Sequence, residues 1–252
     1  MIRKRRKPGS TLDEQLHFLN LPFARQHFDE LVQQAAREEW SHLQYLTRLI
    51  EGETAYRQER STQRRIRDAR FPMIKTFEQF DFTWPSKINR MKVKDLFRLR
   101  FVEENANVLL IGGVGLGKSH LAIALGHAAC LAGYSVHFTT AINIVNHLTA
   151  AQKIGQLAND LKRYLKPDLL VMDEIGYLPI DKNGADLLFQ IVSERYERGA
   201  LIITSNKVFK RWASIFNNDS TLTSALLDRL LHHNETIVIE GKSYRMKDRI
   251  DS

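Results

Sequence analysis

Apolar side chains in the first part of the chain recur at the spacing of a helix. From Pro22 onward they come every three or four residues, the period of one helix face, at Phe28, Val32, Ala36, Trp40, Leu43, Leu46 and Ile50. Thr11-Leu-Asp-Glu14 has the form of a capping box and predicts an earlier helix start, and Phe71-Pro72 ends the pattern. We expect residues 1–70 to form a small all-helical domain, whose apolar stripe packs either within the chain or onto a partner.

The pattern changes near residue 107. Short apolar runs then alternate with helix-like stretches, at Asn107–Ile111, Val136–Phe138, Asp168–Met172 and Ala200–Ile203. Such unbroken runs are typical of strands buried on both faces, and strands that alternate with helices predict a parallel sheet. Residues 71–252 are therefore expected to form an α/β domain. The aromatic residues between Phe77 and Trp84 mark its edge, and we expect most of them in its core.

Charge adds a candidate partner to this picture. The 252 residues carry a net charge of +8, which favours a polyanion such as nucleic acid. The excess is clustered, because a basic run occupies residues 1–7 and residues 57–70 hold six arginines against two acidic residues. Arg64, Arg65 and Arg67 of the second cluster are candidates to follow a phosphate backbone. The alternative is a solvated helix face.

Other classes of protein are disfavoured by what the sequence lacks. No apolar run is long enough to span a bilayer, and the basic N-terminus is not followed by the apolar stretch of a signal peptide. Cys130 is the single cysteine, so no disulfide framework or four-ligand zinc site is expected within one chain. His232 and His233 are adjacent and, in regular structure, cannot comfortably face one metal ion. We expect a cytoplasmic protein with no membrane partner.

The strongest chemical signal is Gly112-Gly-Val-Gly-Leu-Gly117-Lys118-Ser119, which matches the phosphate-binding loop G-x-x-x-x-G-K-[ST]. Its glycines let backbone N–H groups curl around phosphates, and the dipole of the next helix points at them. We expect Lys118 to reach the β- and γ-phosphates and the Ser119 hydroxyl to ligate magnesium. The predicted cofactors are ATP and Mg²⁺, and the predicted binding residues are Gly112, Gly113, Val114, Gly115, Leu116, Gly117, Lys118, Ser119 and His120.

Two further strands end in polar residues. One ends in Asp173-Glu174 and the other leads to Asn206. Because ligands of open parallel sheets bind at the carboxyl ends of the strands, we expect these groups beside the phosphates. Asp173 would hold magnesium together with Ser119, and Glu174 would act as general base on the attacking water. Asn206 would orient that water, unless it simply begins a loop.

Two arginines complete the candidate catalytic set. Arg229, in Leu226-Leu-Asp-Arg-Leu230, would act across a subunit boundary as an arginine finger, which is worth roughly a thousandfold or more in turnover. Arg245, in Ser243-Tyr-Arg245, is the second candidate. Both assignments rest on the local sequence around the arginine and not on a defined spacing from the other motifs. The alternative for each is a surface ion pair, which is the role of most arginines.

The order of these motifs resembles that of the AAA+ ATPases. Within them the chain is most similar to the IstB family of insertion-sequence helper ATPases and to its relative DnaC, the helicase loader. The resemblance covers about residues 67–250 and includes Lys118-Ser-His-Leu-Ala122 and Val171-Met-Asp-Glu-Ile-Gly-Tyr177. It implies a P-loop AAA+ core with a truncated C-terminal lid, since only 23 residues follow Arg229. Leu116 departs from the threonine that many AAA+ proteins carry before the Gly-Lys pair.

The resemblance also implies partners. IstB-type proteins assemble on DNA in an ATP-dependent way and help the transposase of their insertion sequence to choose a target and insert. For this chain it implies a homo-oligomer on double-stranded DNA, with phosphate contacts from Lys153, Lys162, Arg163 and Lys166. We expect an ATPase stimulated by DNA and by oligomerisation. A DnaC-like helicase loader and a nucleotide-gated DNA-binding scaffold with little hydrolysis stay open as alternatives, and a small-molecule kinase is disfavoured by the basic charge.

Overall fold

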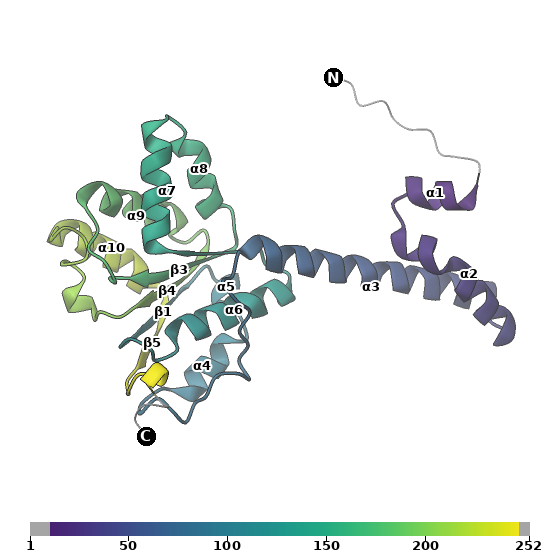
Figure 1. Ribbon diagram of the computed structural model, residues 1–252, viewed down its shortest axis with the longest axis horizontal. Helices are drawn as coiled ribbons and strands as arrows, with labels where there is room; N and C mark the ends of the chain where they lie inside the picture. The colour runs from purple at the N-terminus through teal and green to yellow at the C-terminus, as the bar shows by residue number, and fades with distance from the viewer. Residues whose placement is uncertain (1–10, 247–252) are drawn as a thin grey trace. The chain divides into compact units, whose positions relative to one another are not determined.

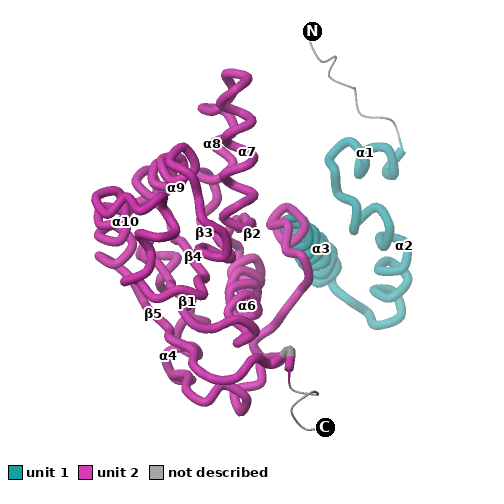
Figure 2. The backbone as a smooth tube through the Cα atoms, turned by 60° about the vertical axis from the view of Figure 1, so that its left-hand side comes forward, with its two compact units in different colours: residues 1–64 teal, residues 65–252 magenta. Residues whose placement is uncertain are grey.

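The computed structural model of the chain describes residues 11–246, except for the side chain of Arg245, so the basic run at residues 1–7 lies outside the described residues. The chain forms two compact units, residues 1–64 and residues 65–252, which we call the helical unit and the sheet unit (Figure 2). The boundary between the units falls inside one long helix. The domain limits expected from the sequence stay a prediction.

Helices and strands alternate along the sheet unit, as the apolar pattern predicted (Figure 1). The helices are α1 (Leu12–Phe18), α2 (Pro22–Arg37), α3 (His42–Ala69), α4 (Arg90–Leu96), α5 (Arg100–Glu103), α6 (Lys118–Ala132), α7 (Ala141–Lys153), α8 (Leu157–Leu165), α9 (Lys182–Arg195) and α10 (Ser220–His232), with short 3-10 helices η1 (Phe209–Arg211) and η2 (Tyr244–Met246). The strands are β1 (Asn107–Gly112), β2 (Val136–Thr140), β3 (Leu169–Ile175), β4 (Ala200–Ser205) and β5 (Asn234–Ile239). The four apolar runs lie in β1 to β4, whereas β5 mixes buried and exposed positions and gives no such run.

Helix α1 begins where the sequence predicted. Glu14 N–H donates to Thr11 Oγ1 at 3.3 Å, and Thr11 N–H donates to Glu14 Oε2 at 3.1 Å. These reciprocal bonds are a capping box, which satisfies backbone donors that the first helical turn leaves open.

The apolar stripe is broken between α2 and α3, and its spacing alone does not reveal the break. Glu39 has a φ of +53°, and Trp40 N–H donates to the Ala35 carbonyl at 2.9 Å, which is a Schellman helix end without its usual glycine. A second capping box starts the next helix, because Gln44 N–H donates to Ser41 Oγ at 3.3 Å and Ser41 N–H to Gln44 Oε1 at 2.7 Å. The stripe is therefore shared by two separate helices.

One polar residue holds the start of α2. Glu53 of α3 is buried and its Oε2 accepts the N–H groups of Phe23, at 2.9 Å, and Ala24, at 3.2 Å. Arg57 Nε donates to the other carboxylate oxygen at 2.9 Å. A carboxylate at a helix N-terminus takes up unpaired N–H donors and suits the helix dipole. Glu53 thus joins α3 to α2.

The sheet is all parallel, with the strand order β2-β3-β4-β1-β5. Successive residues of a strand point to opposite faces. Val108 and Leu110 of β1 enter the core that contains α6, whereas Leu109 and Ile111 enter the core that contains α7, α9 and α10. The sheet is thus covered by helices on both faces, and β1, β3 and β4 end at the same edge.

A buried arginine closes one corner of the sheet unit. Arg195, at the end of α9, is 2% exposed and donates to five carbonyl oxygens, of Tyr164, Leu165, Pro167, Asp168 and Ala200, at 2.8–3.2 Å. Burial lowers the pKa of Arg195 to about 10. The guanidinium therefore satisfies the last carbonyl oxygens of α8 by hydrogen bonding and links them to the first carbonyl of β4.

In the described residues, β5 is followed by η2. Among the helices of residues 11–246, none combines the length and the apolar character needed to cross a bilayer.

Candidate nucleotide-binding site

The Gly112–Ser119 loop connects β1 to α6, as expected for a phosphate-binding loop. Gly115 and Gly117 have φ values of +75° and +84°, a region that side chains disfavour. A Cβ at Gly115 would lie 2.1 Å from Ser243 Oγ, and a Cβ at Gly117 would lie 2.5 Å from the Phe80 ring. Both positions therefore require glycine for conformation and for space.

Lys118 is the first residue of α6 and is 9% exposed. Its Nζ donates to the Gly113 carbonyl at 2.6 Å, within the loop itself. The N-terminus of α6 faces the same loop, so the helix dipole and the lysine bring positive potential to one place. Leu116, which departs from the AAA+ pattern, is buried and packs into the core with α6. The Leu116 side chain therefore contributes to the core. Phosphate binding by this loop would use backbone N–H groups, which do not depend on the side chain at this position.

The two predicted magnesium ligands, Ser119 at the start of α6 and Asp173 in β3, are in contact. Ser119 Oγ donates to Asp173 Oδ1 at 2.9 Å, and Thr204 Oγ1 of β4 donates to the same oxygen at 2.5 Å. Asp173 is 6% exposed. A hydroxyl and a carboxylate are oxygen ligands of the kind that magnesium prefers, so the donor set fits this ion. Thr204 is not among the predicted residues, although its place near the end of a buried strand could have indicated it.

Glu174 stands where β3 departs from regular pairing. The register with β4 shifts between Met172 and Ile175, and Glu174 has a φ of +63°. Its N–H donates to Thr204 Oγ1 at 2.9 Å, while the residue itself is exposed. This bulge turns Glu174 out of the sheet immediately after Asp173. A non-glycine residue in the left-handed region is strained, and such strain collects at functional sites.

Asn206 follows β4 and is exposed beside Gly176, where a Cβ would lie 3.5 Å from Asn206 Oδ1. Asn206, Glu174 and Asp173 line one cavity of about 760 Å³ together with the loop from Val114 to His120. This volume is in the range of small-molecule sites. The structure thus brings together the carboxylates, the asparagine and the phosphate loop that the sequence predicted separately.

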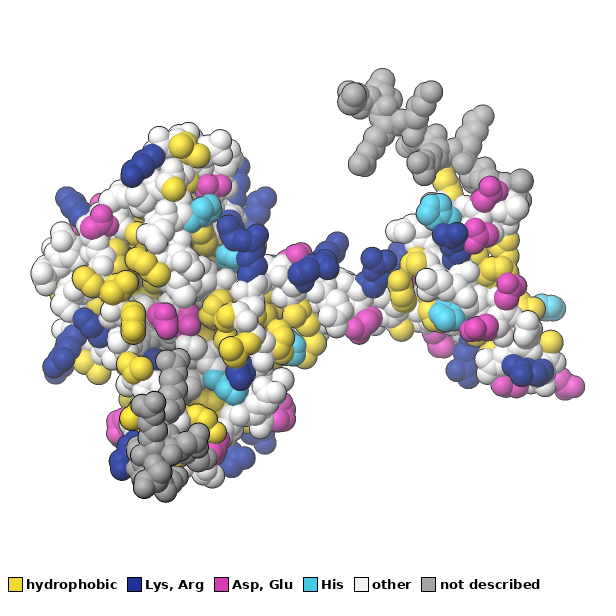
Figure 3. Space-filling view, in the orientation of Figure 1, with side chains coloured by type: hydrophobic (Ala, Val, Ile, Leu, Met, Phe, Trp, Pro, Cys, Tyr) yellow, Lys and Arg dark blue, Asp and Glu magenta, His cyan; other side chains and the backbone are white. Residues whose placement is uncertain are grey.

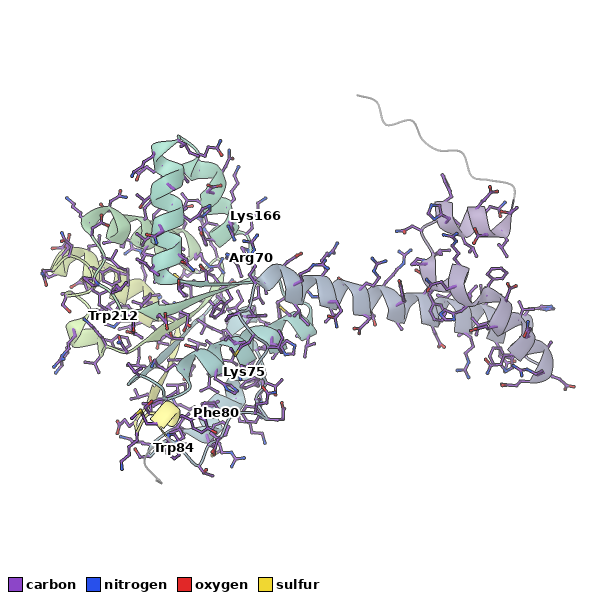
Figure 4. The ribbon with its side chains drawn as sticks, viewed as in Figure 1. Arg70, Lys75, Phe80, Trp84, Lys166 and Trp212 are labelled. Carbon is purple, nitrogen blue, oxygen red and sulfur yellow. The ribbon has the colours of Figure 1, made fainter. Side chains whose placement is uncertain are left out.

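The same cavity has an aromatic side that the sequence did not assign to it. Phe80, Trp84 and Tyr244 line it, and Figure 4 shows Phe80 and Trp84 on one side of the sheet, with Trp212 on the other. Trp84 Nε1 donates to the Lys242 carbonyl at 2.9 Å and the ring meets Tyr244 edge-on at 5.6 Å. Of the aromatic residues that the sequence placed mostly in the core, Phe80 is buried there, whereas Trp84 is only half-buried.

His120 also lies at the cavity, half-buried against Phe80 with the ring centroids 5.4 Å apart. Its Nε2 is 3.0 Å from the Thr76 carbonyl oxygen. Burial lowers the pKa of His120, which favours the neutral ring.

The two candidate arginines lie differently. Arg229 of α10 is not among the residues lining the cavity; its Nη1 donates to the Ala225 carbonyl at 2.9 Å and its guanidinium lies 4.9 Å from the Phe189 ring centroid. The side chain of Arg245 lies outside the described residues. Its neighbour Tyr244 is at the cavity, and Tyr244 N–H donates to the Gly115 carbonyl at 2.8 Å.

The candidate DNA contacts also lie away from the cavity. Lys153, Lys162, Lys166, Arg64 and Arg67 are exposed, Arg163 is half-buried, and Arg65 is half-buried with its Nε 3.0 Å from the Cys130 carbonyl oxygen. Figure 3 shows basic side chains gathered on the part of the sheet unit where Figure 4 labels Arg70 and Lys166. Burial, followed by the charges of Arg163 and Arg70, lowers the pKa of His137 to about 4, so these two arginines share one neighbourhood.

The strand order, with the phosphate loop on a central strand and the acidic pair on the next but one, places the chain in the AAA+ class of P-loop proteins. Solved structures agree on the fold. DnaA from Aquifex aeolicus bound to AMPPCP has a TM-score of 0.57 at 23% identity, covering 71% of this chain and 54% of that one. The DnaC helicase loader has a TM-score of 0.50 at 22% identity, covering 60% of this chain and 87% of that one. The chain thus spans about half the length of the DnaA structure.

The particular family is shown by sequence. The family of IstB-like ATP binding proteins matches residues 14–252, and the chain belongs to this family. It is 40% identical over 238 residues to the IS21 insertion-sequence ATP-binding protein of Pseudomonas aeruginosa, covering 94% of this chain and 89% of that protein. It is 38% identical over 238 residues to the corresponding IS5376 protein of Geobacillus stearothermophilus, covering 94% of each.

Proposed function

We propose that the protein is a magnesium-dependent ATPase that assembles as a homo-oligomer on double-stranded DNA and assists the transposase of its insertion sequence in choosing a target and inserting. The observation that carries the hydrolytic part is the joining of Ser119 to Asp173, with Glu174 and Asn206 in the same cavity. The family and the names of its insertion-sequence relatives support the transposition part over the helicase-loader alternative.

In this proposal Lys118 exchanges the Gly113 carbonyl for the β- and γ-phosphates when ATP binds. Ser119 and Asp173 would hold magnesium, which when bound would supply charge that neutralises the phosphates. Glu174 accepts a proton from the attacking water, and Asn206 orients that water. Thr204 fixes both carboxylate residues, since its hydroxyl donates to Asp173 and accepts the Glu174 N–H.

Arg229 lies outside the cavity of its own chain, which supports a role in the cavity of a neighbouring subunit. Turnover would then depend on assembly, because no arginine is among the described residues that line the cavity of one chain. Arg245 stays a second candidate for this role.

Contacts with DNA are proposed for the basic residues of α7, α8 and the end of α3. Lysine and arginine contacts to phosphates release counterions, so binding should weaken steeply with salt and depend little on sequence. Arg65 has a competing structural role at the end of α6, since it donates to the Cys130 carbonyl. Exposed Lys162 and Lys166 are therefore the better probes.

The experiment is ATP hydrolysis by the purified full-length protein, with and without double-stranded DNA, at two salt concentrations. We expect DNA to stimulate hydrolysis and the stimulation to fade at high salt. Lys118→Ala should abolish ATP binding, whereas Lys182→Ala, a change at an exposed lysine of α9, should leave it intact. A rate that ignores DNA in the unmodified protein would contradict the proposal, and ATP binding by Lys118→Ala would contradict the site.

A further inference from the structure

A second cluster of ligand-type side chains lies apart from the nucleotide cavity. Glu197, His232 and His233 offer one ligand atom each, and these atoms all lie within 4.8 Å of one another. In the part of the chain that the structure describes, no other group of three histidines, cysteines or carboxylates approaches this closely. We propose that this cluster binds one divalent transition-metal ion of the zinc type, and that the ion joins the end of α9 to the end of α10.

The adjacent histidines can face one ion because the backbone changes conformation between them. His232 is the last residue of α10, and His233 is extended, with φ −122° and ψ 91°, just before β5. Their ring centroids are 4.1 Å apart. The sequence expectation assumed regular structure on both sides of the pair, and a helix end followed by a strand is not regular. The pair is therefore brought together by the junction itself.

The distances suit a small metal ion. His232 Nδ1 lies 3.9 Å and His233 Nε2 lies 3.8 Å from Glu197 Oε1. Tetrahedral zinc with bonds of roughly 2.0–2.2 Å separates its ligand atoms by roughly 3.3–3.6 Å. The three side chains are 53–57% exposed. The two distances to Glu197 must close by about half an ångström, and the histidine ligand atoms, which lie within 4.8 Å of each other, by up to about 1.5 Å. Because the side chains are exposed, their rotation can supply this closure without a change of core packing.

The backbone that carries the ligands is held in place. Asn107 N–H donates to the His233 carbonyl at 2.8 Å, and Asn105 Nδ2 donates to the Glu197 carbonyl at 3.4 Å. Glu197 itself has a φ of +58°, a strained conformation for a side-chain-bearing residue. Two loops far apart in sequence are thus presented to each other by the segment that leads into β1.

The Tyr196 hydroxyl lies 2.6 Å from His232 Nδ1, and this hydrogen bond must open for that nitrogen to bind an ion. Two imidazoles and a carboxylate make a mixed nitrogen and oxygen donor set, which suits zinc, cobalt or nickel and not magnesium, and water would complete it. The cluster is therefore chemically distinct from the Ser119 and Asp173 site, where oxygen ligands favour magnesium.

The ion would sit close to the candidate arginine finger. Arg229 is three residues before His232 on α10, and its guanidinium lies over Phe189 of α9. A metal that fastens the ends of α9 and α10 would therefore stiffen the two helices that present Arg229. This consequence rests on the proposed function, whereas the metal site itself does not.

The test uses the full-length protein in millimolar magnesium, with Co²⁺ as a spectroscopic probe and Zn²⁺ as competitor. We expect one Zn²⁺-displaceable Co²⁺ per chain, with a visible d–d band. Glu197→Gln, His232→Gln and His233→Gln should each weaken Co²⁺ binding about a hundredfold, the upper end of what the loss of even an outer partner costs. His42→Gln, an exposed histidine of the helical unit, should bind like the unmodified protein.

Thermal unfolding supplies a second readout. Zn²⁺ should raise the unfolding temperature of the unmodified protein and of His42→Gln, and leave that of the three cluster variants unchanged. Circular dichroism of the variants without metal is the control for folding, and we expect their spectra to match that of the unmodified protein. Equal Co²⁺ bands in the unmodified protein and the cluster variants would overturn the proposal, and so would no displaceable band at micromolar metal in the unmodified protein.

Discussion

The sheet unit and the helical unit differ in how completely each one buries its apolar surface. In the sheet unit, helices cover both faces of the sheet, and Asp173 and Thr204 are buried in mutual contact. In the described part of the helical unit, the buried hydrophobic residues are only Leu16 and Ala24. Its stripe residues lie on the surface, with Val32, Leu43, Leu46 and Ile50 at least half exposed.

When the basic run at residues 1–7 is set aside, the two units also differ in charge. Residues 11–64 hold six arginines against nine acidic residues, a net charge of −3, whereas residues 65–252 hold 26 basic against 20 acidic residues, a net charge of +6. The helical unit without residues 1–7 is therefore acidic overall, although it includes Arg57, Arg60 and Arg64 of the basic cluster at residues 57–70. DNA contact is therefore expected mainly from the sheet unit and the end of α3, while the body of the helical unit is an acidic, apolar-striped surface.

The largest expected effect is on ATP turnover, and we expect it from a change in the sheet unit but not from one in the helical unit. Glu174→Gln should lower ATP turnover about 10²- to 10⁴-fold, because a general base contributes that much, while ATP binding persists. Glu59→Gln, an exposed change in the helical unit, should leave turnover unaltered. Turnover and nucleotide binding of the two variants, measured with DNA present, check this. Unchanged turnover in Glu174→Gln would remove the general-base assignment.

A second comparison concerns packing. Leu125→Ala in α6, where the side chain is 0% exposed, should cost about 2–5 kcal/mol of unfolding free energy through lost contacts and a cavity. Leu46→Ala in α3, where the side chain is 52% exposed, should stay within about 0.5 kcal/mol. Denaturant unfolding of both variants measures the difference. A large loss in Leu46→Ala would mean that the stripe is covered by another chain in solution.

A third comparison uses pH. The folded-state pKa of His137 is lowered to about 4, by burial first and then by Arg163, Arg70 and His147. The unfolded chain takes up a proton near pH 6.5 and the folded chain does not, so stability should fall between pH 6.5 and pH 4 by about 3 kcal/mol. Unfolding midpoints against pH measure the loss. The dependence of stability on pH should be weaker in His137→Gln. An unchanged dependence would mean that other groups cause the loss of stability.

The smallest expected effect lies in the helical unit. Glu53→Gln should cost about 1–2 kcal/mol locally, because the buried carboxylate accepts two N–H groups at the start of α2. Amide hydrogen exchange of α2 should then accelerate, while exchange in β1 and β3 stays slow. Glu51→Gln, at an exposed position on the same helix, is the control. Equal protection of α2 in both variants would show that Glu53 does not hold the helix.

The apolar pattern predicted the buried strands well. A strand that is buried on both faces needs apolar side chains at successive positions, and runs such as Asn107–Ile111 show this. The pattern did not find the break before α3, because the Schellman position holds Glu39 and not glycine. The phosphate loop and its neighbours were identified from motifs whose spacing is local. Thr204, Trp84 and Tyr244 were missed because their role depends on contacts between segments distant in sequence, such as the bond from Trp84 to Lys242.

The five carbonyls gathered by Arg195 have a consequence for how the molecule folds. Four of them belong to residues 164–168, which span the end of α8 and the turn before β3, and the fifth belongs to Ala200 at the start of β4. A charge of this kind is costly to bury until all of its acceptors are in place. The corner should therefore form and open in a single cooperative step, and lysine, with three donors, could not substitute for the guanidinium. Arg195 thus couples the end of α8 to the start of β4, and we expect amide protection in these two segments to be lost together.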